Sequence, residues 1–336
     1  MPVRLGIICP SEIAFRRFMP ALSQDKRFEF CGIAHSSAEE WGTHDPAVIE
    51  GEKAKAQKFI DQYGGKMFSS YSEIVSSHEI DALYLPLPPA LHSKWTKEAI
   101  RCGKHCFVEK PFASEFSQAD STVRAASEAG LALHENYMFI YHSQLDFIRN
   151  EIKERKMGDV RQMRICFGFP FRGQNDFRYN KALGGGALLD CGGYTLKLAS
   201  LLLDGDAEVK YACLSGKEGC EVDIFGTAVI ENSSGLSVSV SFGMDNAYKC
   251  SLEVWGTEKT LLADRILTAP AGFSPSVFYT DNDGTREIKL PPDDTFSKSI
   301  SHFYGCINDS GQRENNYKAI LGQARLMEEF RAKAAR

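Results

Sequence analysis

An acid and a lysine stand directly before a proline, at the end of the apolar run 107–108. Proline has no amide donor and ends a strand, so the sequence predicts that Glu109 and Lys110 are held at a strand's carboxyl end by Pro111. In open α/β sheets the ligand crevice lies at this edge, where a lysine can act in catalysis or contact a cofactor. The alternative is a solvated turn with an ordinary ion pair, the more frequent situation for charged loop residues.

The composition is that of a globular protein with a small-molecule ligand. Of the 336 residues, 43% are hydrophobic and 25% are charged, and 39 basic against 44 acidic residues give a net charge of −5. Neither sign forms a long run, which argues against a nucleic-acid groove or a membrane-surface patch. No signal peptide and no stretch of about 20 apolar residues is recognisable, so a cytoplasmic location without a membrane partner is expected.

The ten cysteines are scattered through apolar runs, as is typical of reduced core thiols. Cys102 and Cys106 lie close together around a histidine. Zinc needs about four ligands, and no second cluster is spaced to supply the others. We therefore predict no metal site.

The first part of the chain alternates strands with helices, which predicts a parallel, doubly wound sheet over residues 1–135. This is a nucleotide-binding (Rossmann) architecture. Ser11 is placed to cap the first helix. The expected strands are 3–9, 28–34, 80–85, the segment ending at Lys110, and 131–134; the expected helices are 11–22, 52–63, 71–77, 92–102 and 117–129.

Residues 136–336 follow a different pattern and are predicted to form an α+β domain for substrate binding and oligomerisation. Successive strands separated by turns indicate an open, mostly antiparallel sheet, with helices on one face. A helical bridge is expected at 137–154, and the C-terminal helix 316–333 could pack back on the first domain. The expected strands are 161–169, 211–214, 224–231, 237–242, 249–255 and 260–263.

The first βα unit and four further segments, taken together, resemble the glucose–fructose oxidoreductase and inositol dehydrogenase (Gfo/Idh/MocA) family, whose members join a Rossmann domain to an antiparallel sheet domain. The segments are 85–92, 109–111, 135–138 and 183–194. Within the family, the similarity is greatest to the branch that contains xylose dehydrogenases and dihydrodiol dehydrogenases. This similarity lies in the amino-acid sequence of 86–92, the tyrosine at 194 and the segment 176–178.

The resemblance implies catalytic roles for Lys110 and Tyr194 at the reacting carbon, with Asp190 beside them, and substrate contacts by Tyr137, Arg178, Asp190 and Tyr194. Oxidising an alcohol requires a group that takes the hydroxyl proton, and a nearby ammonium would make a tyrosine, with its ordinary pKa near 10, a better base. Asp190 would orient a second hydroxyl or the lysine. Lys110 as the direct proton carrier is an open alternative, and so are a packing role for Tyr194 and a solvated Asp190.

The first turn departs from the dinucleotide fingerprint Gly-x-Gly-x-x-Gly/Ala. Cys9 and Ser11 take the first two glycine positions, Pro10 removes an amide donor, and Glu12 adds a negative charge. The amides at Ser11 and Glu12 and the helix dipole are still expected to hold a phosphate. The predicted cofactor-binding residues are Cys9, Ser11, Glu12, Ile13, His35, Ser36, Leu87, Pro88, His92, Glu109, Lys110 and Pro111.

The end of the second strand favours NADP slightly over NAD as cofactor. An acid that would take the ribose hydroxyls of NAD is missing after Ala34, where His35 and Ser36 stand instead. A histidine and hydroxyls suit a 2′-phosphate better, with Arg16 or Arg17 as the cation. His92 has an alternative role as a helix cap, and a structural role is expected for His134 and His142.

The resulting hypothesis is an NAD(P)-dependent oxidoreductase that transfers a hydride to or from a carbon of a sugar, polyol or related small carbohydrate. One alternative is a redox-inactive relative that binds sugars or a partner protein. Another is an enzyme that uses tightly bound NAD(H) for epimerisation or elimination. The alternation at 237–242 and the resemblance predict a homo-oligomer formed through the C-terminal sheet.

Overall fold

The computed structural model describes residues 1–41, 45–173 and 176–335. The chain forms two compact units. The first contains residues 1–113, 117–136 and 296–321, and the second contains residues 114–116, 137–295 and 322–336. The predicted domain boundary between residues 135 and 136 stays a prediction, as does the placement of helix 316–333.

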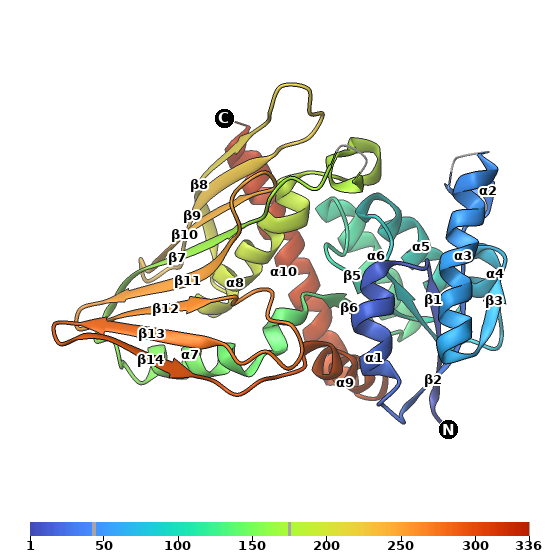
Figure 1. Ribbon diagram of the computed structural model, residues 1–336, viewed down its shortest axis with the longest axis horizontal. Coiled ribbons are helices and arrows are strands. Elements are labelled where there is room, and N and C mark those ends of the chain that lie inside the picture. Colours follow the sequence, from blue (N-terminus) through green and yellow to red (C-terminus); the bar gives the residue numbers. More distant parts are fainter. Residues whose placement is uncertain (42–44, 174–175, 336) are drawn as a thin grey trace. The chain divides into compact units, whose positions relative to one another are not determined.

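Within the described residues, six parallel strands form the sheet of the first unit (Figure 1), in the order β3-β2-β1-β4-β5-β6. This is the Rossmann order, with its reversal between β1 and β4, and it confirms the predicted fold class. The carboxyl ends of β1 and β4 therefore flank the position where this fold binds its ligand. The strands are β1 Val3–Ile8, β2 Phe28–Ala34, β3 Lys66–Phe68, β4 Ala82–Leu85, β5 His105–Glu109 and β6 Leu133–Asn136.

Local sequence explains where the helices of this unit begin. Asp45 accepts a hydrogen bond from the Ala47 amide and precedes a proline at the first position of α3, and Ser70 accepts from the Glu73 amide at the start of α4. Three elements were not predicted: α2, β3 and α9. The helices are α1 Met19–Leu22, preceded by a π-helical turn at Ala14–Phe18, α2 Ala38–Trp41, α3 Pro46–Tyr63, α4 Tyr71–Ser76, α5 Pro89–Arg101, α6 Phe116–Ala129, α9 Thr295–Asn308 and α10 Ser310–Ala334.

Eight strands of the described chain form the sheet of the second unit, in the order β14-β13-β12-β11-β7-β10-β9-β8. Only the pairing of β7 with β10 is parallel among these strands, so the prediction of a mostly antiparallel sheet is confirmed. β13 and β14 were not predicted. The strands are β7 Val160–Gly168, β8 Glu208–Ser215, β9 Phe225–Glu231, β10 Ser237–Gly243, β11 Lys249–Gly256, β12 Thr260–Asp264, β13 Ser276–Asp281 and β14 Gly284–Lys289.

Helices cover one face of this second sheet, as predicted. Alternate residues such as Ile165, Val240 and Val254 are fully buried under α7 (Ser143–Lys153), α8 (Gly193–Leu202) and the part of α10 that belongs to this unit. Phe242 on β10 packs against Phe330 on α10 with ring centroids 5.6 Å apart. No helix among the described residues combines the length and the hydropathy needed to cross a membrane.

Candidate functional site

Glu109 at the end of β5 is built into the sheet edge rather than left in a solvated turn. Its Oε1 accepts hydrogen bonds from the Tyr84 hydroxyl (2.7 Å) and from Asn136 Nδ2 (2.6 Å), which come from the strands on either side. Burial raises the pKa of Glu109, opposed by these hydrogen bonds and by the Lys110 charge. Lys110 follows at the half-exposed position beyond it.

A chain of hydrogen bonds behind Glu109 fixes the Asn136 amide. Asn136 Oδ1 accepts a hydrogen bond from the Ser299 hydroxyl at 2.8 Å. His134 Nε2 lies 2.8 Å from the hydroxyl oxygen of Ser299. Because the single hydroxyl proton of Ser299 is already donated to Asn136, His134 Nε2 must donate to the Ser299 oxygen. Asn136, Ser299 and His134 are all fully buried, and together they orient the amide that donates to Glu109.

His92, on α5, ties two loops at the carboxyl edge of the sheet together. Its Nδ1 and Nε2 each lie 2.7 Å from a backbone carbonyl, of Pro111 and Leu87 respectively. Burial lowers the pKa of this fully buried ring to about 4, so it is neutral at pH 7 and donates to one of the two carbonyls. The ring positions the loops that carry Pro88 and Lys110, and its contact with a cofactor stays a prediction.

The first turn reproduces with a cysteine a conformation that glycine usually supplies. Cys9 has φ of 107°, in the region that favours glycine. The Ser11 amide donates to the Cys9 carbonyl at 3.0 Å and the Ser11 hydroxyl accepts from the Ala14 amide at 3.2 Å, so Ser11 caps this helix as expected. Since the Ser11 amide is already paired, the amides of Glu12 and Ile13 are the first-turn donors that a phosphate would meet.

The Cys9 side chain does not oppose an anion in this turn. The thiol is buried, and burial together with the Glu52 carboxylate raises its pKa to about 12, so the thiol is neutral. Glu52 is itself ion-paired with Lys55 at 2.7 Å. The backbone of the first turn therefore fits a dinucleotide diphosphate, although its glycines are replaced.

Glu40, an acid that follows β2 in the sequence, is hydrogen-bonded to the start of α4. Glu40 accepts hydrogen bonds from the amides of Tyr71 and Ser72, each at 2.9 Å, and so caps α4. The His35 ring lies against the Ser36 carbonyl with Nδ1 at 3.0 Å. Because Glu40 is held at α4, His35 and Ser36 remain the predicted contacts for the ribose side of a cofactor.

The three consecutive glycines 184–186 allow the turn that carries Arg178 to pack closely against their backbone. Gly184 has φ of 78°, and a Cβ on Gly185 would lie 2.4 Å from the Arg178 carbonyl oxygen. The Gly186 amide donates to the same carbonyl at 2.9 Å, and the Gly185 amide donates to Asn180 at 2.9 Å. A side chain at Gly185 would push away the turn that carries Arg178.

Arg178 holds Asp190 in a half-buried ion-pair cluster. Its Nε lies 2.8 Å from Asp190 Oδ2 and its Nη1 lies 3.1 Å from Asp176 Oδ1. Burial lowers the pKa of Arg178, but the charges of Asp190 and Asp176 outweigh burial and leave the pKa raised. The structure brings two predicted substrate contacts, Arg178 and Asp190, together.

The Tyr194 ring is held in an aromatic cluster. Its centroid lies 5.3 Å from that of Tyr137 and 5.4 Å from that of Phe167, both edge to face, and its hydroxyl points at Met138 Sδ at 3.8 Å. Tyr137 is fully buried and its hydroxyl lies against Gly193. This burial makes Tyr137 a support for the Tyr194 ring, and its contact with a substrate stays a prediction.

Lys110 belongs to the first unit, whereas Asp190, Tyr194, Arg178 and Tyr137 belong to the second. Their meeting at one reacting carbon stays a prediction. Within the described residues, no group of three or more His, Cys, Asp or Glu side chains is arranged to hold a metal ion.

Sequence reasoning missed several residues of this arrangement. Lys197 is buried one helical turn beyond Tyr194, and its Nζ lies 5.8 Å from the Tyr137 ring centroid. A lysine inside the apolar run 194–203 was a detectable signal. Ser299, Gln323 and Asp223 come from distant positions in the sequence, and no local pattern predicts their contacts. They hydrogen-bond Asn136, Gly193 and Leu188, respectively, which lie close to site residues along the chain.

Curated relatives of the chain are sugar reductases and dehydrogenases. The chain is 32% identical over 333 residues to a dTDP-3,4-didehydro-2,6-dideoxy-α-D-glucose 3-reductase of Actinomadura kijaniata, covering 99% of this chain and 96% of that protein. A protein of the same name from Streptomyces violaceoruber is 33% identical over 341 residues, covering 99% and 95%. An NADP-dependent D-xylose 1-dehydrogenase of Haloferax volcanii is 27% identical over 270 residues, covering 79% and 82%.

Solved structures agree with these relatives. The 3-ketoreductase KijD10 from Actinomadura kijaniata, in complex with NADP and TDP-benzene, superposes with a TM-score of 0.91 at 32% identity, covering 99% of this chain and 98% of that chain. Structures of the same enzyme exist with a single tyrosine or a single lysine replaced. The predicted class, an NAD(P)-dependent oxidoreductase acting on carbohydrates, is confirmed at that level.

The two parts of the chain match two family models. Residues 6–137 match the model described as an oxidoreductase family with an NAD-binding Rossmann fold, and residues 146–262 match the GFO/IDH/MocA C-terminal domain. These matches cover most of the chain, including the glycine-poor first turn and the segment from Gly184 to Tyr194. The chain is thus a member of the GFO/IDH/MocA family of oxidoreductases.

Proposed function

We propose that this protein is an NADPH-dependent ketoreductase that reduces a carbonyl group of a nucleotide-linked deoxysugar. The observation that carries the proposal is a similarity above 30% that extends over 99% of the chain to reductases of dTDP-linked keto sugars. The similarity to the xylose dehydrogenase is lower and covers less of the chain. A free sugar is therefore the second choice of substrate.

The spacing of two candidate residues supports the same reaction. The tyrosine and the lysine that are replaced in the variants of the 3-ketoreductase lie 84 residues apart, and Lys110 and Tyr194 are also separated by 84 residues (194 − 110 = 84). An insertion or deletion between the two would break this equality. The match supports Lys110 and Tyr194 as the catalytic residues.

The chain's own residues supply the acid chemistry. Bound NADPH would supply the hydride, held through the first-turn amides of Glu12 and Ile13 and by residues at the ends of β2, β4 and β5. A carbonyl oxygen gains negative charge as its carbon is reduced, and the Tyr194 hydroxyl is the proposed proton donor to that oxygen. Lys110 would stabilise the developing charge as an ammonium. Lys110 as the direct proton donor is the alternative assignment.

Asp190 is the proposed contact for a second sugar hydroxyl. Its Oδ2 is bound by Arg178, so the carboxylate is fixed in orientation and stays an acceptor. The carboxylates of Asp176 and Asp190 hold the Arg178 guanidinium in this position through ion pairs. A fixed carboxylate distinguishes a hydroxyl donor from an alkyl group at the same carbon of the sugar.

Steady-state kinetics test the proposal. The purified protein is assayed with NADPH and with NADH against a dTDP-linked keto-deoxysugar, and with NADP⁺ against D-xylose. We expect turnover with the nucleotide-linked keto sugar and a higher kcat/KM with NADPH than with NADH. Turnover of xylose alone would replace the proposed substrate by the second choice, and no turnover of either would contradict the proposal.

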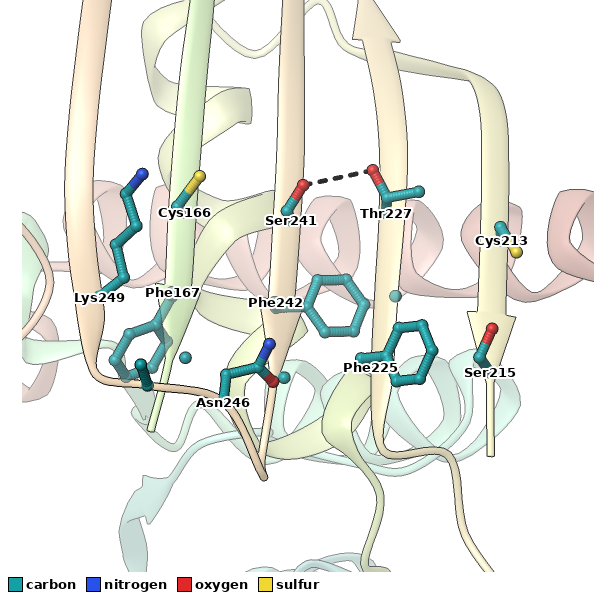
Figure 2. A pocket seen from close by; sticks show the side chains of 14 residues that line it. Cys166, Phe167, Cys213, Ser215, Phe225, Thr227, Ser241, Phe242, Asn246 and Lys249 are labelled. Atoms are coloured by element: carbon teal, nitrogen blue, oxygen red, sulfur yellow. Dashed lines mark hydrogen bonds between the residues drawn. The ribbon is translucent and has the colours of Figure 1, made fainter. Parts of the chain in front are cut away.

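The proposal includes a homo-oligomer formed through the open face of the second sheet. This face, turned away from the helices, carries exposed aromatic side chains, with Trp255 59% and Tyr211 56% exposed. A cavity of about 410 Å³ in this sheet is lined by Cys166, Cys213, Thr227, Ser241 and Lys249, among others (Figure 2). None of the residues lining it is a predicted catalytic or cofactor residue. Exposed aromatic side chains on a sheet face are typical of an interface between subunits.

A cytoplasmic location agrees with the proposed substrate and cofactor, and it too remains a proposal.

A further inference from the structure

We propose that Asp223 is a positioning residue for the proposed reductase: its carboxylate anchors the start of the helical segment that carries Asp190 and Tyr194, and so sets the direction of the Tyr194 ring. Asp223 lies in the loop before β9, about thirty residues beyond Tyr194. The inference rests on the proposed role of Tyr194.

The anchor consists of two hydrogen bonds and one close contact. The Leu188 amide donates to Asp223 Oδ2 at 2.7 Å, and the Ala187 amide donates to the Asp223 backbone carbonyl at 2.8 Å. A Cβ on Gly186, which has φ of 124°, would lie 2.5 Å from Asp223 Oδ1. Both oxygens of one carboxylate are thus fitted around the backbone where the helical segment begins, and only glycine at position 186 leaves room for them.

The segment needs such an anchor because its first turn is π-helical. Residues Leu188–Gly192 form a π-turn that continues directly into α8. A π-turn holds one residue more than an α-turn, and it is rare and occurs mostly as a single turn within an α-helix. Asp190 lies inside this turn and Tyr194 follows it. If the turn relaxed to α-helix, Tyr194 would rotate relative to Asp190 by about 100°, the step per residue of an α-helix.

The far side of the π-turn is held by different residues. Gln323 Nε2 donates to the Gly193 carbonyl at 2.9 Å, and the Tyr137 hydroxyl occupies the space where a Cβ of Gly193 would stand. With its C-terminal side held there, the turn keeps its extra residue only while Leu188 is also held. Asp223 is the side chain that does so.

The charge of Asp223 also favours this placement. A carboxylate at the N-terminal amides of a helix interacts favourably with the helix dipole. Arg331 on α10 adds an attractive charge for Asp223. Burial raises the pKa of Asp223, and the hydrogen bond from the Leu188 amide opposes that rise.

Three variants of the full-length protein test the inference: Asp223→Ala, Asp223→Asn and, as matched control, Glu221→Ala, an exposed acid in the same loop. Kinetics with NADPH and the keto sugar are measured together with the dissociation constant of NADPH. We expect Asp223→Ala to lower kcat about 100-fold, the usual cost of a catalytic group displaced by about 1 Å, with unchanged NADPH affinity. Asp223→Asn keeps an oxygen for the Leu188 amide and should recover most of kcat.

Hydrogen–deuterium exchange of the peptide covering 186–190 supplies a readout without turnover. We expect the Leu188 amide to exchange at least about tenfold faster in Asp223→Ala, the loss of one charge-assisted hydrogen bond, no more than about threefold faster in Asp223→Asn, which keeps a neutral hydrogen bond, and at the native rate in Glu221→Ala. If the wild-type enzyme proves inactive, the proposed function fails and this exchange pattern still decides the anchor.

Two results would overturn the inference. One is native kcat and native exchange in Asp223→Ala. The other is a loss in Asp223→Asn as large as in Asp223→Ala, because the carboxylate would then act by charge and not by anchoring the amide. Should Asp223→Ala fail to fold, Asp223→Asn decides alone: kcat within about tenfold of native supports the anchor, and a loss of about 100-fold contradicts it.

Discussion

At the scale of single residues, the two halves of the proposed chemistry are supported in different ways. Glu109 and Lys110 extend a hydrogen-bonded sheet edge, whereas Tyr194 is held by ring packing and Asp190 by the Arg178 ion pair. A ring fixed by packing keeps its direction when its hydroxyl is removed. The hydroxyl of Tyr194 can therefore be tested almost separately from the fold.

Replacing Tyr194 by phenylalanine should lower kcat by about 100-fold to 10,000-fold, the usual range for a lost general acid. The aromatic cluster remains filled, so the melting temperature should change little. Tyr211→Phe, at an exposed tyrosine of the second sheet, is the control and should keep native kinetics. A Tyr194→Phe enzyme with native kcat would leave Lys110 as the proton donor.

His105 makes the stability of the protein depend on pH. Its Nδ1 accepts a hydrogen bond from the Ala132 amide at 2.9 Å, and burial, followed by the Arg313 charge, lowers its pKa to about 4. The unfolded chain, with a pKa near 6.5, binds a proton first, so the stabilisation is complete above about pH 6.5 and is lost as the pH falls towards 4.

The corresponding measurement is the urea midpoint between pH 7.5 and pH 5. His105→Asn should flatten this dependence, while His78→Asn, at an exposed histidine, should leave it unchanged. His92 contributes in the same direction, because burial lowers its pKa to about 4 as well. Equal slopes for His105→Asn and the native protein would remove His105 from the account.

At the scale of elements, α9 acts as part of the candidate site although it follows the whole second sheet in sequence. It returns to the first unit, and Ser299 on it completes the hydrogen bonds behind Glu109. The sequence offered no sign of this, because the segment 296–308 carries neither a fingerprint nor a charged motif. The segment 183–194 was recognised, but the reason for its glycines, the close approach of Gly185 to Arg178 and of Gly186 to Asp223, needed the structure.

Ser299→Ala should destabilise the protein by about 1–3 kcal/mol, because it leaves the buried Oδ1 of Asn136 without its hydroxyl donor. The Asn136 amide would then be less well oriented, and NADPH should bind more weakly. Ser301→Ala, at an exposed serine of the same helix, should stay within about 0.5 kcal/mol of the native protein. Urea unfolding and fluorescence titration of NADPH check both effects, and identical results for the two variants would contradict the role of Ser299.

At the scale of the whole molecule, the sequence predicted both sheets and the family, because alternating strands and helices and runs of strands are local patterns. It missed the edge strand β14, which is exposed along almost its whole length and shows no alternation. The prediction of the site was limited by contacts between residues that are far apart in the sequence, which local patterns do not reveal. Cys9 illustrates this: its identity suggested a weakened phosphate turn, whereas its backbone has a φ of 107°, in the region that favours glycine.

The proposed homo-oligomer, formed through the open face of the second sheet, can be tested by a substitution on that face. Trp255→Glu places a charge among the exposed aromatic residues of that face and should shift the protein towards monomers in light scattering. Lys58→Glu, at an exposed position of α3, is the control and should keep the native mass. A native protein that is already monomeric would contradict the proposed oligomer without touching the redox assignment.

The most direct test of the central claim follows the hydride itself. The protein is incubated with NADPH that carries deuterium at the transferable position of the nicotinamide, together with the dTDP-linked keto-deoxysugar, and the product is analysed by mass spectrometry and NMR. We predict a single deuterium on the newly formed carbinol carbon of the sugar, and loss of this product in Tyr194→Phe. An unlabelled sugar recovered unchanged, with the deuterium still on the cofactor, would contradict the claim.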